Sequence, residues 1–262
     1  MAKAKEIMPR GLIGPSLASL LFLLTASTAL SDGNEDGHAV VPLPAEIFGI
    51  ILSEDIPDGA NLQTVMDQGV IQKWKTDIKV YIAHENESEA DSINHLIETQ
   101  LKPLMLSVSE ATGLGFKRVG SLSEANVVFV FAEKPSDAER FLERTELREW
   151  FGARDAQKFD DIEAAFRDAP AFCFRFTNAP DNEITRAIGF TSTAESTAVQ
   201  EKCLARNLLF AVGLSGRTDS QASAKSPETS SRSIGLLDEM ALDVLYREGV
   251  EPGMTLRQAL SK

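Results

Sequence analysis

Zinc-dependent hydrolysis is the first chemistry to test against this sequence, because His84-Glu85 begins the pattern H-E-x-x-H. That pattern places two histidines one helical turn apart to bind zinc, and its glutamate acts as general base. Position five is Ser88, so the second ligand is missing, and the other histidines, His38 and His95, are not spaced as a ligand pair. The histidines therefore predict no metal site and no cofactor. The carboxylates after His84 are expected to form a solvated acidic loop, with weak calcium binding as the alternative.

Two other kinds of catalytic site are also disfavoured. The sequence contains no G-x-S-x-G, although serines are frequent in Gln221–Ser233. The chain has two cysteines, Cys173 and Cys203, and neither has a histidine nearby in sequence, which argues against a catalytic thiol. In an oxidising compartment the pair is expected to form one disulfide, and two buried free thiols are the alternative.

The N-terminus predicts export. Three basic residues precede the mostly apolar run Leu12–Leu24, and small residues follow it up to Ala29, which is the order of a secretory signal peptide. We expect residues 1–29 to be this peptide, residues 30–73 a flexible leader and N-terminal extension, and residues 74–262 the folded domain. A net charge of -13 disfavours nucleic-acid binding and binding to anionic membranes. The predicted location is the periplasm or the exterior, with no membrane contact beyond the signal peptide.

The hydrophobic pattern predicts an α+β domain, because the expected strands do not alternate regularly with helices. The run Ala125–Ala132 is almost continuously apolar, which predicts a central strand buried on both faces. Pro103 is expected to kink the helix that ends near Thr112. The other expected strands are Lys79–Ala83, Phe116–Val119, Phe172–Thr177 and Ile184–Thr193, and the main later helices are Glu201–Leu214 and Leu236–Tyr246.

The helix Glu201–Leu214, with its end at Gly213-Leu214, resembles the metal-binding helix of the zincin metallopeptidases, and specifically the metzincin pattern H-E-x-x-H-x-x-G-x-x-H. Aligned on Gly213, the pattern places its first histidine at Arg206, its glutamate at Asn207, its second histidine at Phe210 and its third histidine at Gly216. All four positions are therefore substituted. A cation at Arg206 and an apolar ring at Phe210 oppose metal binding.

The chain from about Trp74 to Met254 also resembles the DUF2927 family of exported bacterial proteins, which is grouped with the zincin-like peptidases. The resemblance is carried by Trp74, the pair Cys173 and Cys203, the AVGL helix end, the Asp238…Leu245-Tyr246 helix and Pro252-Gly253-Met254. It implies a zincin-like (metzincin-type) fold with a mixed sheet packed on a central helix, and it implies no established activity.

The leading hypothesis from these observations is a catalytically inactive relative of the zincins that acts as a peptide- or protein-binding scaffold. Zincins hold substrate as an added strand at a sheet edge, and that groove can outlast the metal. The partner would be an extended peptide or an envelope protein, and Arg206 could contact its carboxylate. A surface Arg206, or one paired with Glu201 or Glu239, is the alternative. The alternative function is a hydrolase that uses other residues in the same cleft, and a purely structural envelope protein is a third.

Overall fold

The structure is a computed structural model that describes residues 47, 50, 51, 62–84, 89–152, 160, 164, 173–215 and 234–262. Its strands are β1 (Ile78–His84), β2 (Phe116–Arg118), β3 (Val127–Ala132), β4 (Cys173–Asn178) and β5 (Arg186–Ser192). Its α-helices are α2 (Leu62–Gln68), α3 (Ala90–Leu96), α4 (Lys102–Thr112), α5 (Pro135–Leu142), α6 (Thr145–Phe151), α8 (Thr197–Ala211), α9 (Leu236–Tyr246) and α10 (Leu256–Leu260). A π-helical turn, η2 (Ile97–Leu101), and the 3₁₀ turns η3 (Leu122–Glu124) and η5 (Pro180–Asn182) complete the set.

The five strands form one mixed sheet in the order β2-β1-β3-β5-β4. Neighbours along β2, β1, β3 and β5 are parallel, whereas β4 runs antiparallel to β5. At the centre of the sheet Phe129 lies between Ile82 and Gly189. The α+β class and the mixed sheet are thus confirmed, and β4 and β5 form a hairpin.

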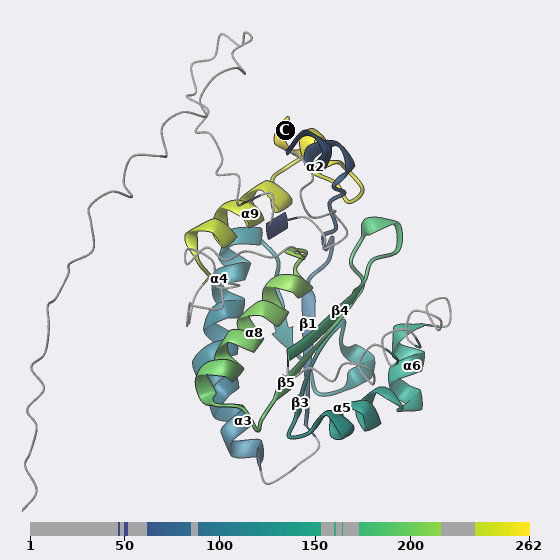
Figure 1. Cartoon of the computed structure of the whole chain (residues 1–262), viewed down its shortest axis with the longest axis vertical. Coiled ribbons are helices and arrows are strands. Elements are labelled where there is room, and N and C mark those ends of the chain that lie inside the picture. The colour runs from purple at the N-terminus through teal and green to yellow at the C-terminus, as the bar shows by residue number, and fades with distance from the viewer. Residues whose placement is uncertain are drawn as a thin grey trace, which may run out of the picture. The chain divides into compact units, whose positions relative to one another are not determined.

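The sheet separates two hydrophobic cores. Along β3, Phe129 and Phe131 belong to the core beneath α3, α4, α8 and α9, while Val128 and Val130 belong to the core beneath α5 and α6. Figure 1 shows these two groups of helices on opposite sides of the sheet. Every residue of β3 is buried, as expected for a strand whose side chains alternate between two covered faces. The prediction of a central, doubly buried strand is confirmed.

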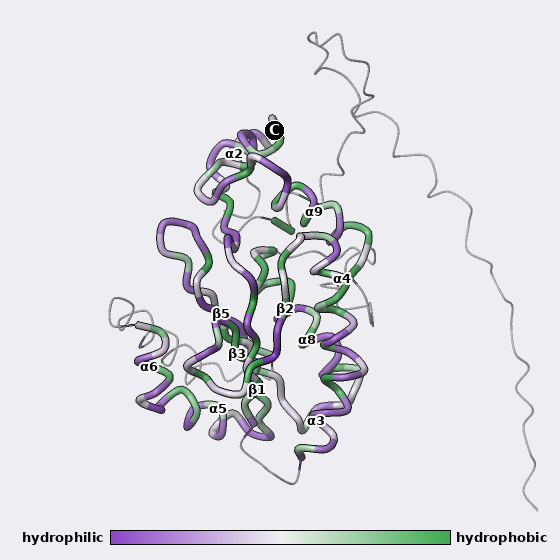
Figure 2. Tube along the Cα trace, turned by 180° about the vertical axis from the view of Figure 1, so that it is seen from behind, coloured by the Kyte–Doolittle hydropathy of each residue, from purple (hydrophilic) through white to green (hydrophobic). Residues whose placement is uncertain are grey.

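The helical stretch from α3 to α4 contains a π-helical turn where the sequence predicted a kink. Pro103 lies at the start of α4, and the Lys102 N–H donates to the Ile97 carbonyl, five residues back. Proline has no amide hydrogen and its ring crowds the carbonyl four residues earlier, so a wider turn relieves the crowding. Figure 2 shows hydrophilic and hydrophobic residues alternating along this stretch, with Leu104 and Val108 buried.

Described residues before Trp74 contribute to the compact unit that contains the sheet. Ile47, Ile50, Ile51 and Ile71 all lie in the larger core. The Ile71 N–H also donates to the Met254 carbonyl near the C-terminus. Aliphatic side chains and backbone bonds therefore bind residues before Trp74 to the domain. Within the described residues, no helix combines the length and apolar character needed to cross a membrane.

Candidate functional site

Three of the four substituted positions lie on α8, the helix that packs against β4 and β5. Asn207 is buried at 1% exposure, whereas Arg206 and Phe210 are partly exposed. A helix places residues four apart on the same face, so Arg206 and Phe210 share a face that Asn207 does not. The fourth position, Gly216, lies outside the described residues.

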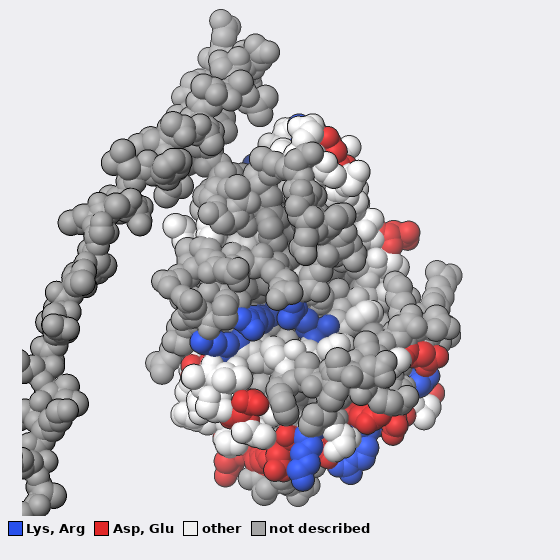
Figure 3. Space-filling view, in the orientation of Figure 1, with Lys and Arg blue, Asp and Glu red and all other residues white. Residues whose placement is uncertain are grey.

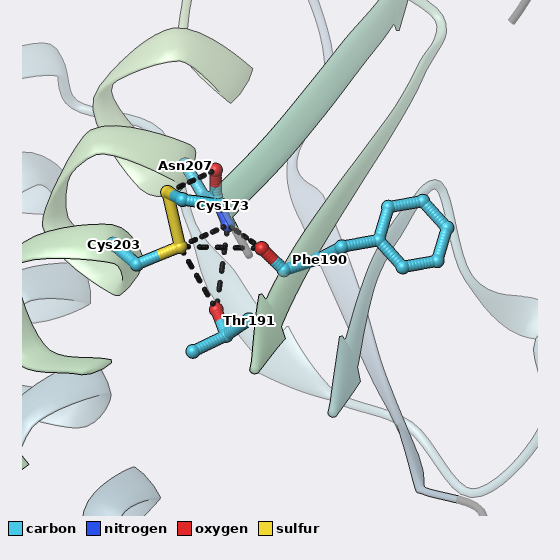
Figure 4. The surroundings of a disulfide bond; sticks show 5 residues. All are labelled: Cys173, Phe190, Thr191, Cys203 and Asn207. Atoms are coloured by element: carbon cyan, nitrogen blue, oxygen red, sulfur yellow. Dashed lines mark hydrogen bonds between the residues drawn. A yellow bond between two sulfur atoms is a disulfide. The ribbon is translucent and has the colours of Figure 1, made fainter. Parts of the chain in front are cut away.

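Asn207 connects α8 to β5. Its Nδ2 donates to the Phe190 carbonyl at 3.0 Å and lies 3.4 Å from Thr191 Oγ1 (Figure 4). Gly189 makes this approach possible, because a Cβ at residue 189 would lie 2.9 Å from the Asn207 Cβ. Asn207, which the metzincin pattern would replace with glutamate, therefore serves here as a helix-to-sheet hydrogen-bond donor.

A disulfide joins Cys173 of β4 to Cys203 of α8, with the Cα atoms 5.5 Å apart. Figure 4 shows this bond next to Asn207, where Thr191 Oγ1 donates to Cys203 Sγ at 3.4 Å. The predicted pairing is confirmed. The bond closes a sequence separation of 30 residues, which contributes about 3–4 kcal/mol in the chain-entropy model. It also fixes the edge strand to the helix.

Phe210, at the position of the second histidine, is covered by a cation. The Arg175 Cζ from β4 lies 4.9 Å from the centroid of the Phe210 ring. A guanidinium over an aromatic face is attracted by the ring quadrupole, and both groups here are half-buried. The contact brings positive charge to a place where a metal site needs lone pairs.

Further basic residues lie on α8, in addition to the Arg175 side chain that covers Phe210. Lys202 and Arg206 are four residues apart, and Phe210 follows four residues later under Arg175. Figure 3 shows a band of Lys and Arg over this region of α8 and β4, on a protein whose net charge is -13. We call Arg175, Lys202 and Arg206 the cationic strip. A strip of this kind favours acidic or anionic ligands.

The cationic strip lies next to a sheet edge. In the described sheet β4 is the last strand, and its strand partner β5 lies on one side only. An edge strand presents backbone N–H and C=O groups to an incoming extended chain. Arg175 is itself a residue of β4, so this one strand offers both backbone hydrogen-bonding groups and a positive charge to a ligand.

The two described histidines lie on elements other than α8. His84 ends β1 and is exposed, and His95 is exposed on α3. Over the described part of the chain, no three His, Cys, Asp or Glu side chains are grouped closely enough to hold a metal ion. His38 lies outside the described residues.

The C-terminal end of α8 is held by two aromatic residues. Trp74 Nε1 donates to the Ala211 carbonyl at 2.6 Å, and the Tyr246 hydroxyl donates to the Val212 carbonyl at 3.0 Å. These bonds satisfy carbonyls that a helix end leaves without partners. Burial raises the pKa of Tyr246, and the Trp74 N–H donating to its oxygen opposes this.

Lys73, beside the same aromatic group, is buried with its Nζ donating to the Val250 carbonyl at 2.9 Å. Its Nζ also lies 5.0 Å from the centroid of the Tyr246 ring. Burial lowers the pKa of Lys73, and the nearby Glu251 carboxylate opposes that shift. The chain before β1 thus fixes the end of the helix that carries the site.

Fold and site together define an α+β domain whose disulfide-linked edge strand and helix carry a cationic strip. Comparison with protein families places the chain in a described family: residues 50–262 match the model "Protein of unknown function (DUF2927)", and the chain belongs to that family. No curated protein matches the chain.

Sequence reasoning identified the helix, the two cysteines and the position of Arg206, but it missed two structural relations. One is the contact between Arg175 and Phe210, whose only local signal was the alternation of Phe and Arg in the strand. The other is the burial of Asn207, which the sequence suggested was an ordinary polar helix residue. Gly189 inside an expected strand was the one available sign of a close approach.

Proposed function

We propose that this protein is an exported, catalytically inactive relative of the zincin metallopeptidases that binds extended, acidic peptide segments. The peptide would add as a further strand to the side of β4 that faces away from β5. Its acidic side chains, or its terminal carboxylate, would contact the cationic strip of Arg175, Lys202 and Arg206.

The observation that carries the proposal is the position of the cationic strip beside the sheet edge. Arg175 is a residue of the edge strand, and its side chain lies over Phe210 of α8. Strand addition supplies affinity through backbone hydrogen bonds, whereas side chains next to the edge supply specificity. Arginine matches carboxylate geometry with paired donors.

Two further observations support the other parts of the proposal. The Cys173–Cys203 disulfide suits an oxidising compartment, which is the compartment to which the signal peptide predicted at residues 1–29 would lead. The residues at the positions of the zincin ligands on α8, Arg206 and Phe210, offer no lone pair to a metal, which supports binding in place of hydrolysis.

The test is a binding titration by fluorescence polarisation. A ten-residue labelled peptide that alternates Glu with Val is compared with the Lys version and with an acidic version that is N-methylated on alternate backbone amides. We expect the Glu peptide to bind best, the Lys peptide to bind at least about tenfold more weakly, and salt to weaken the Glu peptide. N-methylation is expected to remove most of the affinity, because the edge bonds need backbone N–H groups.

The matched variants are Arg206→Ala on the cationic strip and Arg118→Ala on β2, the strand at the opposite edge of the sheet. Each removes one arginine, but only the first should weaken binding. Equal affinity of the two variants would show that net charge, not the strip, attracts the peptide. Cleavage of the unlabelled peptide, followed by mass spectrometry, would support a hydrolase instead.

A further inference from the structure

The disulfide between β4 and α8 lies among hydrogen-bonding groups (Figure 4). Two donors are close to one of its sulfurs, since Thr191 Oγ1 is 3.4 Å and Asn207 Nδ2 is 3.5 Å from Cys203 Sγ. Two acceptors are close as well: the Phe190 carbonyl oxygen is 3.2 Å from Cys203 Sγ, and Asn207 Oδ1 is 3.8 Å from Cys173 Sγ. Each sulfur thus has an acceptor within reach, and Cys203 Sγ also has two donors.

These groups suit the reduced cysteines as well as the disulfide. A disulfide sulfur carries no hydrogen, so it has nothing to donate to the two acceptors. After reduction the Cys203 thiol can donate to the Phe190 carbonyl and the Cys173 thiol to Asn207 Oδ1, while the Thr191 hydroxyl continues to donate to Cys203 Sγ. A buried polar group without a partner is costly, and reduction leaves neither thiol in that state.

The two cysteines differ in exposure. Cys203 is 3% exposed, whereas Cys173 is the first residue of the edge strand and is half-buried. A reductant therefore approaches the bond from the side of Cys173. Arg175 lies two residues further along on the same face of β4, where its positive charge attracts an anionic thiolate. The bond is thus placed for attack at Cys173 Sγ, with Cys203 Sγ as the leaving group.

The donors to Cys203 assist such an exchange. A thiolate of the reductant forms a bond to Cys173 Sγ, the bond between the two cysteine sulfurs breaks, and Cys203 Sγ leaves with the electron pair. Thr191 and Asn207 stabilise the negative charge on it, and a stabilised thiolate is the better leaving group. The second thiol of a dithiol then displaces Cys173. The protein gains two electrons and two protons, and the reductant becomes a disulfide.

The reduced strand remains part of the sheet. Along its whole length β4 pairs with β5 through the backbone, and neither sulfur takes part in that ladder. Reduction removes the covalent link between the first residue of β4 and α8. In the described sheet β4 has a strand neighbour on one side only, so this end depends on the link more than an inner strand would.

We propose that the Cys173–Cys203 bond is a reversible thiol switch, opened by an external dithiol while the protein stays folded. Reduction releases the start of β4 from α8, and oxidation fixes it again. The switch acts on the strand that carries Arg175, but the inference does not depend on peptide binding at that strand.

The experiment compares the rates at which dithiothreitol reduces the full chain with and without urea. Free thiols are trapped in acid, alkylated in denaturant and counted by mass spectrometry. We expect the native rate to lie within about a hundredfold of the rate in urea, far-UV circular dichroism to keep its native form, and oxidised glutathione to restore the bond. A slower native rate would overturn the proposal, because reduction through global unfolding alone is slowed about a thousandfold or more.

A variant far from the bond separates local opening from unfolding. Leu242→Ala leaves a cavity in the core beneath α9 and lowers the stability of the whole domain. The native rate of reduction should be the same in this variant as in the parent protein. Acceleration would show that the bond opens only in the unfolded chain, and would refute the switch.

A matched pair of variants tests the donor. Thr191→Val removes the hydroxyl next to Cys203 Sγ and should slow native reduction by about threefold or more. Thr145→Val, the same change at an exposed residue of α6, should leave the rate unchanged. A loss of stability alone would accelerate reduction, so slower reduction is specific to the lost donor. Equal rates for the two variants would refute the assignment of Cys203 as the leaving group.

Hydrogen exchange followed by mass spectrometry shows what the switch releases. In the reduced protein the amides of β4 should exchange at least about tenfold faster, while β1 and β3 keep their protection. Equal acceleration over the whole sheet would mean that the fold is lost. Unchanged exchange in β4 would mean that the bond does not restrain the strand, and either result overturns the proposal.

Discussion

Replacement of Asn207 by alanine tests whether this side chain stabilises the fold. The amide is buried at the contact of α8 with β5 and lies against Gly189. Alanine keeps the Cβ and has a higher helix propensity than asparagine, but it removes both hydrogen-bonding atoms. The variant therefore measures the connection between helix and sheet with little change to α8 itself.

The expected cost follows from the bonds that are lost. Asn207 donates one bond of 3.0 Å to the Phe190 carbonyl and lies 3.4 Å from Thr191 Oγ1. A buried hydrogen bond contributes about 1 kcal/mol, and a buried acceptor left without a donor adds about 1–2 kcal/mol. We expect the free energy of unfolding to fall by about 2–3 kcal/mol. At about 2–4 °C per kcal/mol for a domain of this size, Tm should fall by roughly 4–12 °C.

The assay is urea unfolding followed by far-UV circular dichroism, together with a thermal scan. The matched control is Asn94→Ala, which removes the same amide from an exposed position on α3. That change should alter stability by less than about 0.5 kcal/mol.

The reasoning about Asn207 is refuted if Asn207→Ala and Asn94→Ala have equal effects. A second variant, Asn207→Asp, places an acceptor where a donor is needed. It should be less stable than the alanine variant at neutral pH and should recover part of its stability as the pH falls, because a protonated carboxyl can donate. A variant whose stability did not recover in acid would contradict the donor role.

Three further predictions concern the support of the site. The double variant Cys173→Ser, Cys203→Ser should lose about 3–4 kcal/mol in urea unfolding, an amount that the chain-entropy model gives for the loop; an unchanged midpoint would contradict it. Gly213→Ala should cost more than about 2 kcal/mol, because φ is +96° and a Cβ would lie 2.3 Å from a backbone carbonyl, while Gly120→Ala, in open space, should be neutral in the same assay. Burial raises the pKa of Tyr246, so the unfolded chain ionises first. Its contribution to stability is present below pH about 10 and is lost as the pH rises further, and Tyr246→Phe should show a smaller loss between pH 9 and 11 in a urea titration.

Local patterns determined much of this protein. The burial of β3 on both faces, the helix from Leu236 to Tyr246 and the end of α8 near Gly213 were all predicted from the hydrophobic pattern and from glycine. Asp238 accepts from the Gly235 N–H at 2.9 Å and so caps the first turn of α9. These features depend on interactions within a few residues, so the sequence alone encodes them.

The sequence alone also argued against a metal site on α8. The residue types at positions 206 and 210, arginine and phenylalanine, exclude a histidine pair on the helix without any knowledge of the fold. In contrast, the sequence did not show that residues before Trp74 contribute to the core, because an apolar run such as Ile47–Leu52 does not reveal what it packs against. Only the packing of Ile47 and Ile71 into the core revealed it.

Tertiary structure decided which residues of the site contact one another. Arg175 and Phe210 are 35 positions apart and meet only because the disulfide and the hairpin register place β4 over α8. Asn207 became a buried donor because Gly189 faces it across the helix-to-sheet contact. Such relations depend on helix rotation and strand register, which are set by the whole core and not by any local run of residues.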